Sequence, residues 1–193
     1  LVHTRSFEMY GVHPSGSNPE GRVITRYGNR LYIGLRTTIG PEFLVFDVED
    51  NPRNPQFVGA LPSSFDHSIY DIATNGAYAF LAIKPGNPPS GLPTRELIII
   101  DVRGTPRDTG GGFNATNTTN DTEGAMSLYL IGNTLYMGRE RVSNLLERDF
   151  YVLNVGSSTK PQYVKSRRLG IPTTSLHGTP RVLDVVVQGN RAF

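Results

Sequence analysis

The stretch "LIIIDV" (Leu97–Val102) decides the fold, because four consecutive apolar residues, three of them β-branched, end in Asp and Val. Two further stretches have the same form: "FLVFDV" (Phe43–Val48) and "FYVLNV" (Phe150–Val155). Short apolar runs bounded by Gly and Pro are typical of strands that are buried on both faces. Three copies at intervals of about 50 residues indicate a repeat architecture.

A second pattern precedes each copy and also ends the chain. It is a Gly and Asn pair between two strand-like runs, as in Gly28-Asn29, Asn75-Gly76, Gly132-Asn133 and Gly189-Asn190. Such pairs suit the positive-φ positions of two-residue hairpin turns. Aligned on the aromatic residue that follows the turn, the equivalent positions are expected to be Tyr32, Tyr78, Tyr136 and Phe193.

A fourth, more polar strand is expected after the apolar run, at Gln56–Pro62 in the first repeat and Gln162–Ile171 in the third. A polar strand suits the outer edge of a sheet. Four antiparallel strands in about 50 residues form the blade of a β-propeller. The sequence therefore predicts an all-β fold, a β-propeller built from four-stranded antiparallel blades of about 50 residues, three complete plus a partial fourth.

The chain is expected to be a single β-propeller domain or a fragment of one, over residues 1–193. The repeats are placed at about 23–62, 68–118, 124–171 and, in part, 181–193, with an outer strand of a preceding blade at 6–12. Closed propellers typically have four to eight blades, so we expect a larger parent protein or closure with another copy. A β-sandwich and a parallel β-solenoid are the alternatives, and the same four-strand order in three repeats favours the propeller.

The apolar runs, the segment Asn51–Gly59 with its two Pro residues, and the hairpins resemble the LVIVD repeat over about Val23 to Phe193. Members of that family are propeller repeats of bacterial and archaeal cell-surface proteins. The resemblance thus implies a propeller at a cell surface and specifies no activity. This sequence departs from the pattern at Asn154, which replaces Asp, and in two inserts, Lys84–Glu96 and Arg139–Asp149.

The composition narrows the function classes. The chain has no Cys, which excludes disulfides and thiol catalysis. Its formal net charge is only +2, with 19 basic and 17 acidic residues interspersed, so no nucleic-acid partner is expected. No apolar run approaches the ~18 residues of a membrane span, and we expect no direct membrane span in this chain.

Three Asn-x-Thr triplets stand together in "NATNTTNDT", at Asn114, Asn117 and Asn120. Each is an acceptor sequence for N-glycosylation. The alternative is a polar, turn-prone loop in which the side chains of Asn and Thr satisfy the backbone. With the family resemblance, the triplets predict an extracellular or cell-surface location.

Histidines and carboxylates mark the connections that lead from an outer strand to the next inner strand. The candidates for ligand binding are His67, His177, Asp66 and Glu123, while His13 and Glu20 occupy comparable stretches. These connections are expected to lie on one face, near the channel of a propeller. Because the His residues stand at different offsets from the aligned aromatic residue, no metal site and no cofactor are predicted.

Asp71 and Asp184 do occupy equivalent positions, each five residues before a hairpin Gly and on an expected innermost strand. Paired carboxylates are the requirement of glycoside hydrolysis, so the two residues are the candidates for catalysis. The alternative is that both accept hydrogen bonds from backbone or channel water. No catalytic residue is assigned beyond these candidates.

The sequence favours a binding or assembly module at a cell surface, with a protein or glycan as partner, over an enzyme. The contacts are expected from the two inserts and from the loops at His67 and His177. The alternatives are a hydrolase acting on a sugar or lactone at the channel mouth, and a structural subunit of a surface layer or fibre that forms a homo-oligomer.

Overall fold

The described part of the chain consists only of strands and their connections. The structure, a computed structural model, describes residues 20–36, 40–49, 52–61, 67–84, 95–115, 124–140, 148–157, 159–169, 181–189 and 191–193. Within these ranges no helix occurs. The expected outer strand at 6–12 lies outside them.

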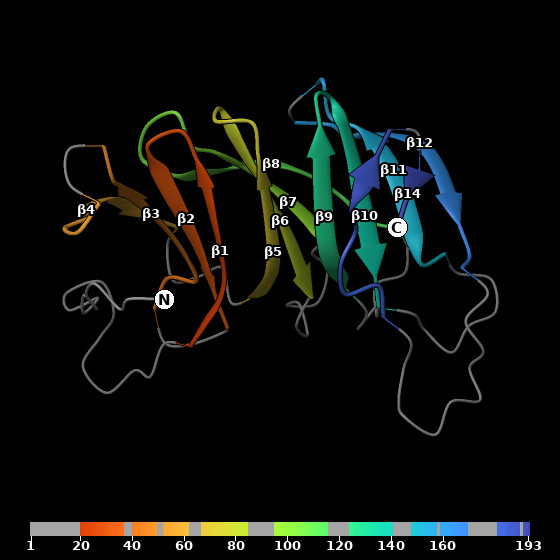
Figure 1. The fold of residues 1–193 in the computed structure, drawn as a ribbon, viewed down its shortest axis with the longest axis horizontal. Coiled ribbons are helices and arrows are strands. Elements are labelled where there is room, and N and C mark those ends of the chain that lie inside the picture. Colours follow the sequence, from red (N-terminus) through yellow and green to blue (C-terminus); the bar gives the residue numbers. More distant parts are fainter. Residues whose placement is uncertain are drawn as a thin grey trace.

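Three antiparallel sheets of four strands follow one another along the chain (Figure 1). Sheet 1 contains β1 (Gly21–Tyr27), β2 (Arg30–Leu35), β3 (Phe43–Asp47) and β4 (Gln56–Ala60). Sheet 2 contains β5 (Ser68–Thr74), β6 (Tyr78–Lys84), β7 (Leu97–Asp101) and β8 (Arg107–Phe113). Sheet 3 contains β9 (Ala125–Ile131), β10 (Thr134–Arg139), β11 (Phe150–Asn154) and β12 (Gln162–Arg167). A terminal hairpin contains β13 (Val187–Gln188) and β14 (Arg191–Ala192).

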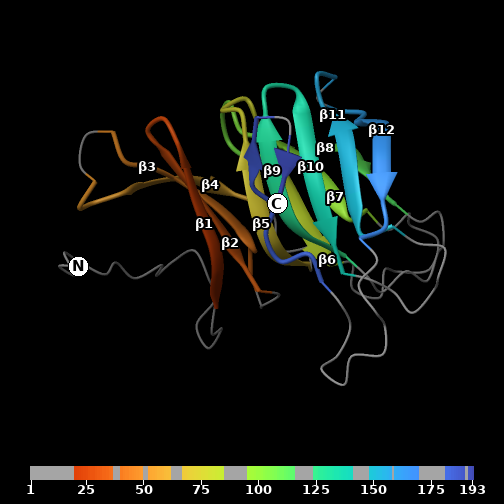
Figure 2. The ribbon, with the colours of Figure 1, turned by 45° about the vertical axis from the view of Figure 1, so that its right-hand side comes forward.

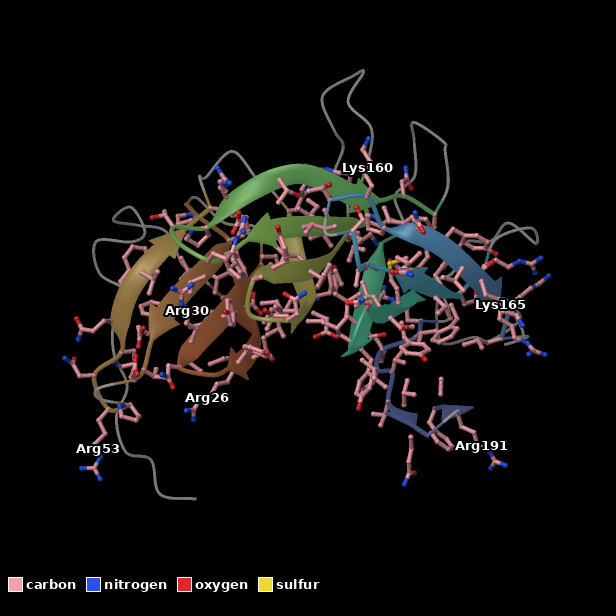
Figure 3. All side chains as sticks on the ribbon, turned by 90° about the horizontal axis from the view of Figure 1, so that it is seen from above. Arg26, Arg30, Arg53, Lys160, Lys165 and Arg191 are labelled. Atoms are coloured by element: carbon pink, nitrogen blue, oxygen red, sulfur yellow. The ribbon has the colours of Figure 1, made fainter. Side chains whose placement is uncertain are left out.

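In each sheet the strands are neighbours in the order in which they follow in the sequence. The first strand β5 lies between β1 and β9, and Figure 2 shows the sheets one beside the next. Seen from above, the sheets form an arc, and its two ends are marked by Arg26 on β1 and Arg191 on β14 (Figure 3). The all-β prediction and its blade-like sheets are confirmed, and the arc of described residues does not close into a ring.

The expected hairpins are present, and the turn glycines explain them. Gly28, Gly76, Gly132 and Gly189 have φ between 54° and 87°, a left-handed conformation that favours glycine. The cross-strand register corrects one detail of the sequence alignment. Opposite Val23, Asp71 and Ser127 stand Gly34, Ala82 and Gly138. Counted from these pairs, the residue equivalent to Tyr32 is Phe80, so the alignment on Tyr78 was wrong by two residues.

The recurring Asp-Val or Asn-Val pair has a local physical role. The Oδ1 atoms of Asp47, Asp101 and Asn154 each accept the N–H of the residue two positions on, at 2.8, 3.1 and 2.9 Å. This is an Asx turn, and an amide oxygen makes it as well as a carboxylate does. The Val that directly follows each Asp or Asn donates its N–H to a main-chain carbonyl of the neighbouring hairpin turn; these residues are Val48, Val102 and Val155. The replacement of Asp by Asn154 therefore keeps the turn.

The middle sheet explains the fully apolar run "LIII". Ile98 and Ile100 pack in a cluster with side chains of sheet 1, whereas Leu97 and Ile99 pack in a cluster with side chains of sheet 3. Side chains of a strand alternate between its two faces, so a sheet packed on both sides needs apolar residues at every position.

Candidate functional site

Asp71 joins two neighbouring sheets. It follows a β-bulge at Tyr70 in β5. Its Oδ1 accepts the N–H of Ile72 at 2.8 Å, and its Oδ2 accepts the N–H of Leu128 in β9 at 2.6 Å. Both carboxylate oxygens therefore hold main-chain donors, one of them in the next sheet, and the side chain connects sheet 2 to sheet 3.

Asp184 repeats half of this arrangement. Its Oδ1 accepts the N–H of Val185 at 2.8 Å, as that of Asp71 accepts the N–H of Ile72. Burial raises the pKa of Asp71 above its ordinary value; the N–H donors of Leu128 and Ile72 oppose this effect, and the charge of Asp184 adds to it. The hydrogen bonds of Asp71 give it a connecting role between sheets 2 and 3. Catalysis by the pair stays a prediction.

The His and carboxylate candidates of the connections fall largely outside the described residues. His13, His177, Asp66 and Glu123 lie there, as do Asn117 and Asn120. His67 is described, directly before β5, and is half-buried. Within the described ranges, no group of three or more His, Asp or Glu residues could hold a metal ion.

Glu96 and Arg139 form a buried ion pair that the sequence interpretation missed. Glu96 precedes β7, and Arg139 ends β10 in the next sheet. The guanidinium Nε and Nη2 of Arg139 donate to the two carboxylate oxygens of Glu96 at 2.5 and 2.7 Å. Both side chains are within 1% of complete burial. These ends of the two inserts therefore belong to the packing between sheets, and ligand contacts would have to come from the residues between them.

An acid stands before the third strand in every sheet. Glu42, Glu96 and Asp149 are all buried, and their carbonyl groups accept the N–H of Leu35, Ile83 and Arg139 respectively. The recurrence was visible in the sequence as "EFLVF", "ELIII" and "DFYVL". A charged residue beside an apolar run usually indicates that a loop meets the strand there. For this reason the sequence did not predict that these three acids are buried.

A second charged cluster lies where three connections leave or rejoin the described strands. We call it the root cluster, and it consists of Lys84, Glu140 and Arg181. Nζ of Lys84 lies 2.7 Å from Oε2 of Glu140, and Nη2 of Arg181 lies 2.6 Å from Oε1. Lys84 is the last described residue before 85–94, Glu140 the last before 141–147, and Arg181 the first after 170–180.

A third charged group lies at the opposite end of the strands of sheet 2, where Asp101 pairs with Tyr78. Nη2 of Arg103 lies 2.6 Å, and Nη2 of Arg107 lies 3.3 Å, from Oδ2 of Asp101. The hydrogen bonds from the Arg103 side chain, more than any other contact, hold the pKa of Asp101 well below its ordinary value. Both arginines extend into solvent, so this group stabilises a turn.

Asn114 follows the end of β8, which comprises Arg107–Phe113, and is half-buried. The outer strand of the second repeat is thus the Gly-rich segment "RDTGGGF", and the first Asn-x-Thr triplet begins directly after it.

The fold and these contacts define an all-β protein of repeated four-stranded antiparallel sheets that are joined by charged and main-chain contacts. No known protein family matches the chain, and neither a curated protein nor a solved structure matches it. Among the described residues no helix is long and apolar enough to span a membrane.

Proposed function

We propose that this chain forms part of a β-propeller of the LVIVD-repeat type and serves as a binding or assembly module at a cell surface. Support for the propeller comes from the sheets, which share one strand order and pack face to face in an arc with their first strands adjacent. A propeller has this arrangement, with the first strand of each blade nearest the axis.

The root cluster carries the functional part of the proposal. The ion pairs of Glu140 with Lys84 and Arg181 bring together the points where segments 85–94, 141–147 and 170–180 leave or rejoin the sheets. The first two segments form most of the inserts of the second and third repeats, and the third contains His177. Insertions of repeat proteins gather on one face, which is often the binding face. The closeness of Lys84, Glu140 and Arg181, where the three segments join the described strands, is the observation that supports the proposal.

The experiment replaces residues 85–94 and 141–147 by short Gly-Ser linkers and measures binding to a panel of immobilised glycans and to intact cells of the source organism. We expect a loss of at least tenfold, about 1.4 kcal/mol, because the loops would contribute the contacts. Lys160→Ala, in the turn between β11 and β12, is the control that should leave binding unchanged. Equal binding by the linker variant and the wild type would overturn the proposal.

Export is a further part of the proposal. It rests on the triplets at Asn114, Asn117 and Asn120 together with the family resemblance. The natively purified protein is expected to have a mass above its 21.2 kDa polypeptide in hexose-sized steps, and Asn114→Gln should remove one glycan. A mass equal to that of the bare polypeptide would count against export through a glycosylating pathway.

A further inference from the structure

The first strand of each of the three sheets has a β-bulge at the same position. In β1, β5 and β9 one residue has no partner in the second strand of its sheet, and these residues are Arg22, Tyr70 and Met126. A bulge leaves a residue outside the ladder of hydrogen bonds and redirects its side chain, and bulges are frequent next to active sites. The repeat thus places one side chain per sheet outside the regular alternation of the first strand.

In sheets 1 and 2 the two bulge residues contact each other. The guanidinium carbon of Arg22 lies over the ring of Tyr70, 3.8 Å from the ring centroid. A cation at this distance is attracted to the face of an aromatic ring. The side chain of Tyr70 packs in turn against the core cluster between sheets 2 and 3. The ring therefore holds the guanidinium of Arg22 in a defined position across the junction of sheets 1 and 2.

The guanidinium of Arg22 has no oxygen partner among the described residues. The other arginines in the strands of sheets 1 and 2 all hold an oxygen of this chain: Arg26 that of Gly28, Arg30 that of Val102 and Arg107 that of Asp101. The carboxylate of Asp71, directly after Tyr70, holds the N–H groups of Ile72 and Leu128. Because Arg22 is also exposed, its N–H groups are available to a ligand.

The contact with Tyr70 leaves the edge of the guanidinium plane accessible, and this edge recognises anions. The N–H groups of arginine form a planar fork that binds both oxygens of a carboxylate at once. One unpaired cation matches one negative charge. A carboxylate therefore fits better than a doubly charged phosphate, which the carboxylate of Asp71, next to Tyr70 in β5, would repel more strongly.

The main chain around this position suits a ligand with hydroxyl groups. The first strands β1 and β5 are the edges of their sheets. An edge strand presents main-chain N–H and C=O groups without a partner in the sheet, and hydroxyl groups bond to both kinds. A carboxylate together with several hydroxyl groups is the chemistry of a sugar acid.

We propose that Arg22 and Tyr70 form a binding site for the carboxylate of a sugar acid, such as a uronic acid. Arg22 donates two N–H groups to the carboxylate, Tyr70 holds the guanidinium in place, and the main-chain edges of β1 and β5 bond the hydroxyl groups. The inference goes beyond the proposed function, because the site lies on the first strands and uses no residue of the two inserts. The variant with linkers in place of 85–94 and 141–147 retains the site and should bind the sugar acid as the wild type does, so either proposal can fail alone.

The test titrates the isotope-labelled 193-residue chain with D-glucuronate and follows the amide signals by NMR. We expect saturable shifts of the signals of β1 and β5, with a Kd on the order of 1 mM because the ligand is a single sugar. D-glucose, which lacks the carboxylate, and inorganic phosphate at the same ionic strength should bind at least about tenfold more weakly. Equal binding of glucose or of phosphate would overturn the proposal.

Variants of the two residues separate charge from geometry. Arg22→Gln removes the cation, and Arg22→Lys keeps the charge but not the planar fork, so both should weaken the binding of glucuronate at least about tenfold. Tyr70→Phe keeps the aromatic face and should retain most of the affinity. Tyr70→Leu removes that face and should weaken binding several-fold. Equal affinities of the Phe and Leu variants would contradict the role of the ring.

Arg26→Gln is the matched control. Arg26 lies further along the same strand, is also exposed, and donates to the carbonyl of Gly28. This variant loses the same charge as Arg22→Gln and should change the Kd by less than about twofold, because salt screens a charge outside the site. Equal losses for the two Gln variants would mean that net charge alone attracts the ligand.

Two further results would also overturn the proposal. One is the absence of glucuronate-dependent shifts in β1 and β5, and the other is an acidic peptide that binds at Arg22 more tightly than glucuronate does. Circular dichroism verifies that the variants are folded, which is expected for Arg22 because its side chain is exposed.

Discussion

The guanidinium of Arg139 in sheet 3 holds the carboxylate of Glu96 in sheet 2 by two hydrogen bonds, of 2.5 and 2.7 Å. The two residues stand 43 positions apart in the sequence, and both are buried. A third donor of Arg139, Nη1, reaches the carbonyl of Arg148 at 3.2 Å. The side chain of Arg139 thereby joins sheet 2 to sheet 3 and also contacts the segment that leads into β11.

Loss of one partner of this pair should be costly. Arg139→Met leaves the Glu96 carboxylate buried without its cation, and we expect the free energy of unfolding to fall by about 3–5 kcal/mol. The double variant Glu96→Leu with Arg139→Met removes both charges and should lose less than the sum of the two single variants. Urea unfolding measures all three. Additive losses would show that the two residues are not coupled.

The exposed pair of Arg36 with Glu20 provides the matched control. Its N–O distance is 3.1 Å, yet both side chains are more than 60% exposed. Arg36→Met should therefore change the free energy of unfolding by less than about 1 kcal/mol. A similar loss for the two Arg variants would mean that burial does not decide the strength of these ion pairs.

Asp101 should make stability depend on pH. Its pKa is lowered in the folded state, so its contribution is present above its ordinary value of 3.8 and is lost as the pH falls through the folded-state pKa. Asp101→Asn keeps the oxygen of the Asx turn and removes the charge. We expect this variant to be less stable than the wild type at neutral pH, with a difference that disappears in acid and shrinks in salt. Thermal unfolding over pH and salt measures it, and a pH-independent difference would contradict the ion-pair explanation.

Asp47 tests the turn itself. Its Oδ1 accepts the N–H of Glu49 at 2.8 Å. Asp47→Ala should cost about 1 kcal/mol, because one hydrogen bond is lost. Asp47→Asn should stay close to the wild type, since Asn154 makes the same bond in the third repeat. Chemical denaturation of both variants gives the comparison, and equal losses for Ala and Asn would argue against the Asx turn.

Gly111 tests the packing between outer strands. A Cβ at this position of β8 would lie 2.1 Å from the carbonyl oxygen of Thr159. Gly111→Ala should therefore destabilise the protein by about 1–3 kcal/mol, because backbone has to shift. Gly21→Ala, also in a strand, has nothing within 4 Å of the added Cβ and should be nearly neutral. Unfolding midpoints of the two variants decide the point, and equal effects would show that sheets 2 and 3 do not pack as closely as described.

The elements governed by local chemistry were predictable from the sequence. The hairpin glycines need positive φ, and the run Leu97–Ile100 alternates between two buried faces, so both patterns indicate their structure directly. The strand β8 was not identified, because glycine is depleted in strands. Here Gly111 is required by the close approach of Thr159, which only the packed sheets reveal.

The charged contacts between sheets were beyond the sequence interpretation for a similar reason. Glu96 is the last residue of one polar insert and Arg139 the first residue of the other, so both were assigned to loops. Whether a charge at a strand end faces solvent or a partner 43 residues away depends on how neighbouring sheets pack. Asp71 was predicted to lie on an innermost strand, and β5 confirms that it is on the first strand of sheet 2. Its bond to Leu128 needed the structure.

The ion pair of Glu96 with Arg139 also restricts which repeat can be duplicated to add a sheet to such a protein. In the second repeat the position of Arg139 is occupied by Ile83, whose N–H makes the equivalent bond to the carbonyl of the acid. A tandem duplication of the second repeat would place a new Ile83 opposite the first Glu96 and leave that carboxylate buried without its cation, at a cost of several kcal/mol. A duplicated third repeat would bring its own Arg139 opposite Asp149. Tandem duplication of the third repeat is therefore expected to destabilise the protein less than duplication of the second repeat.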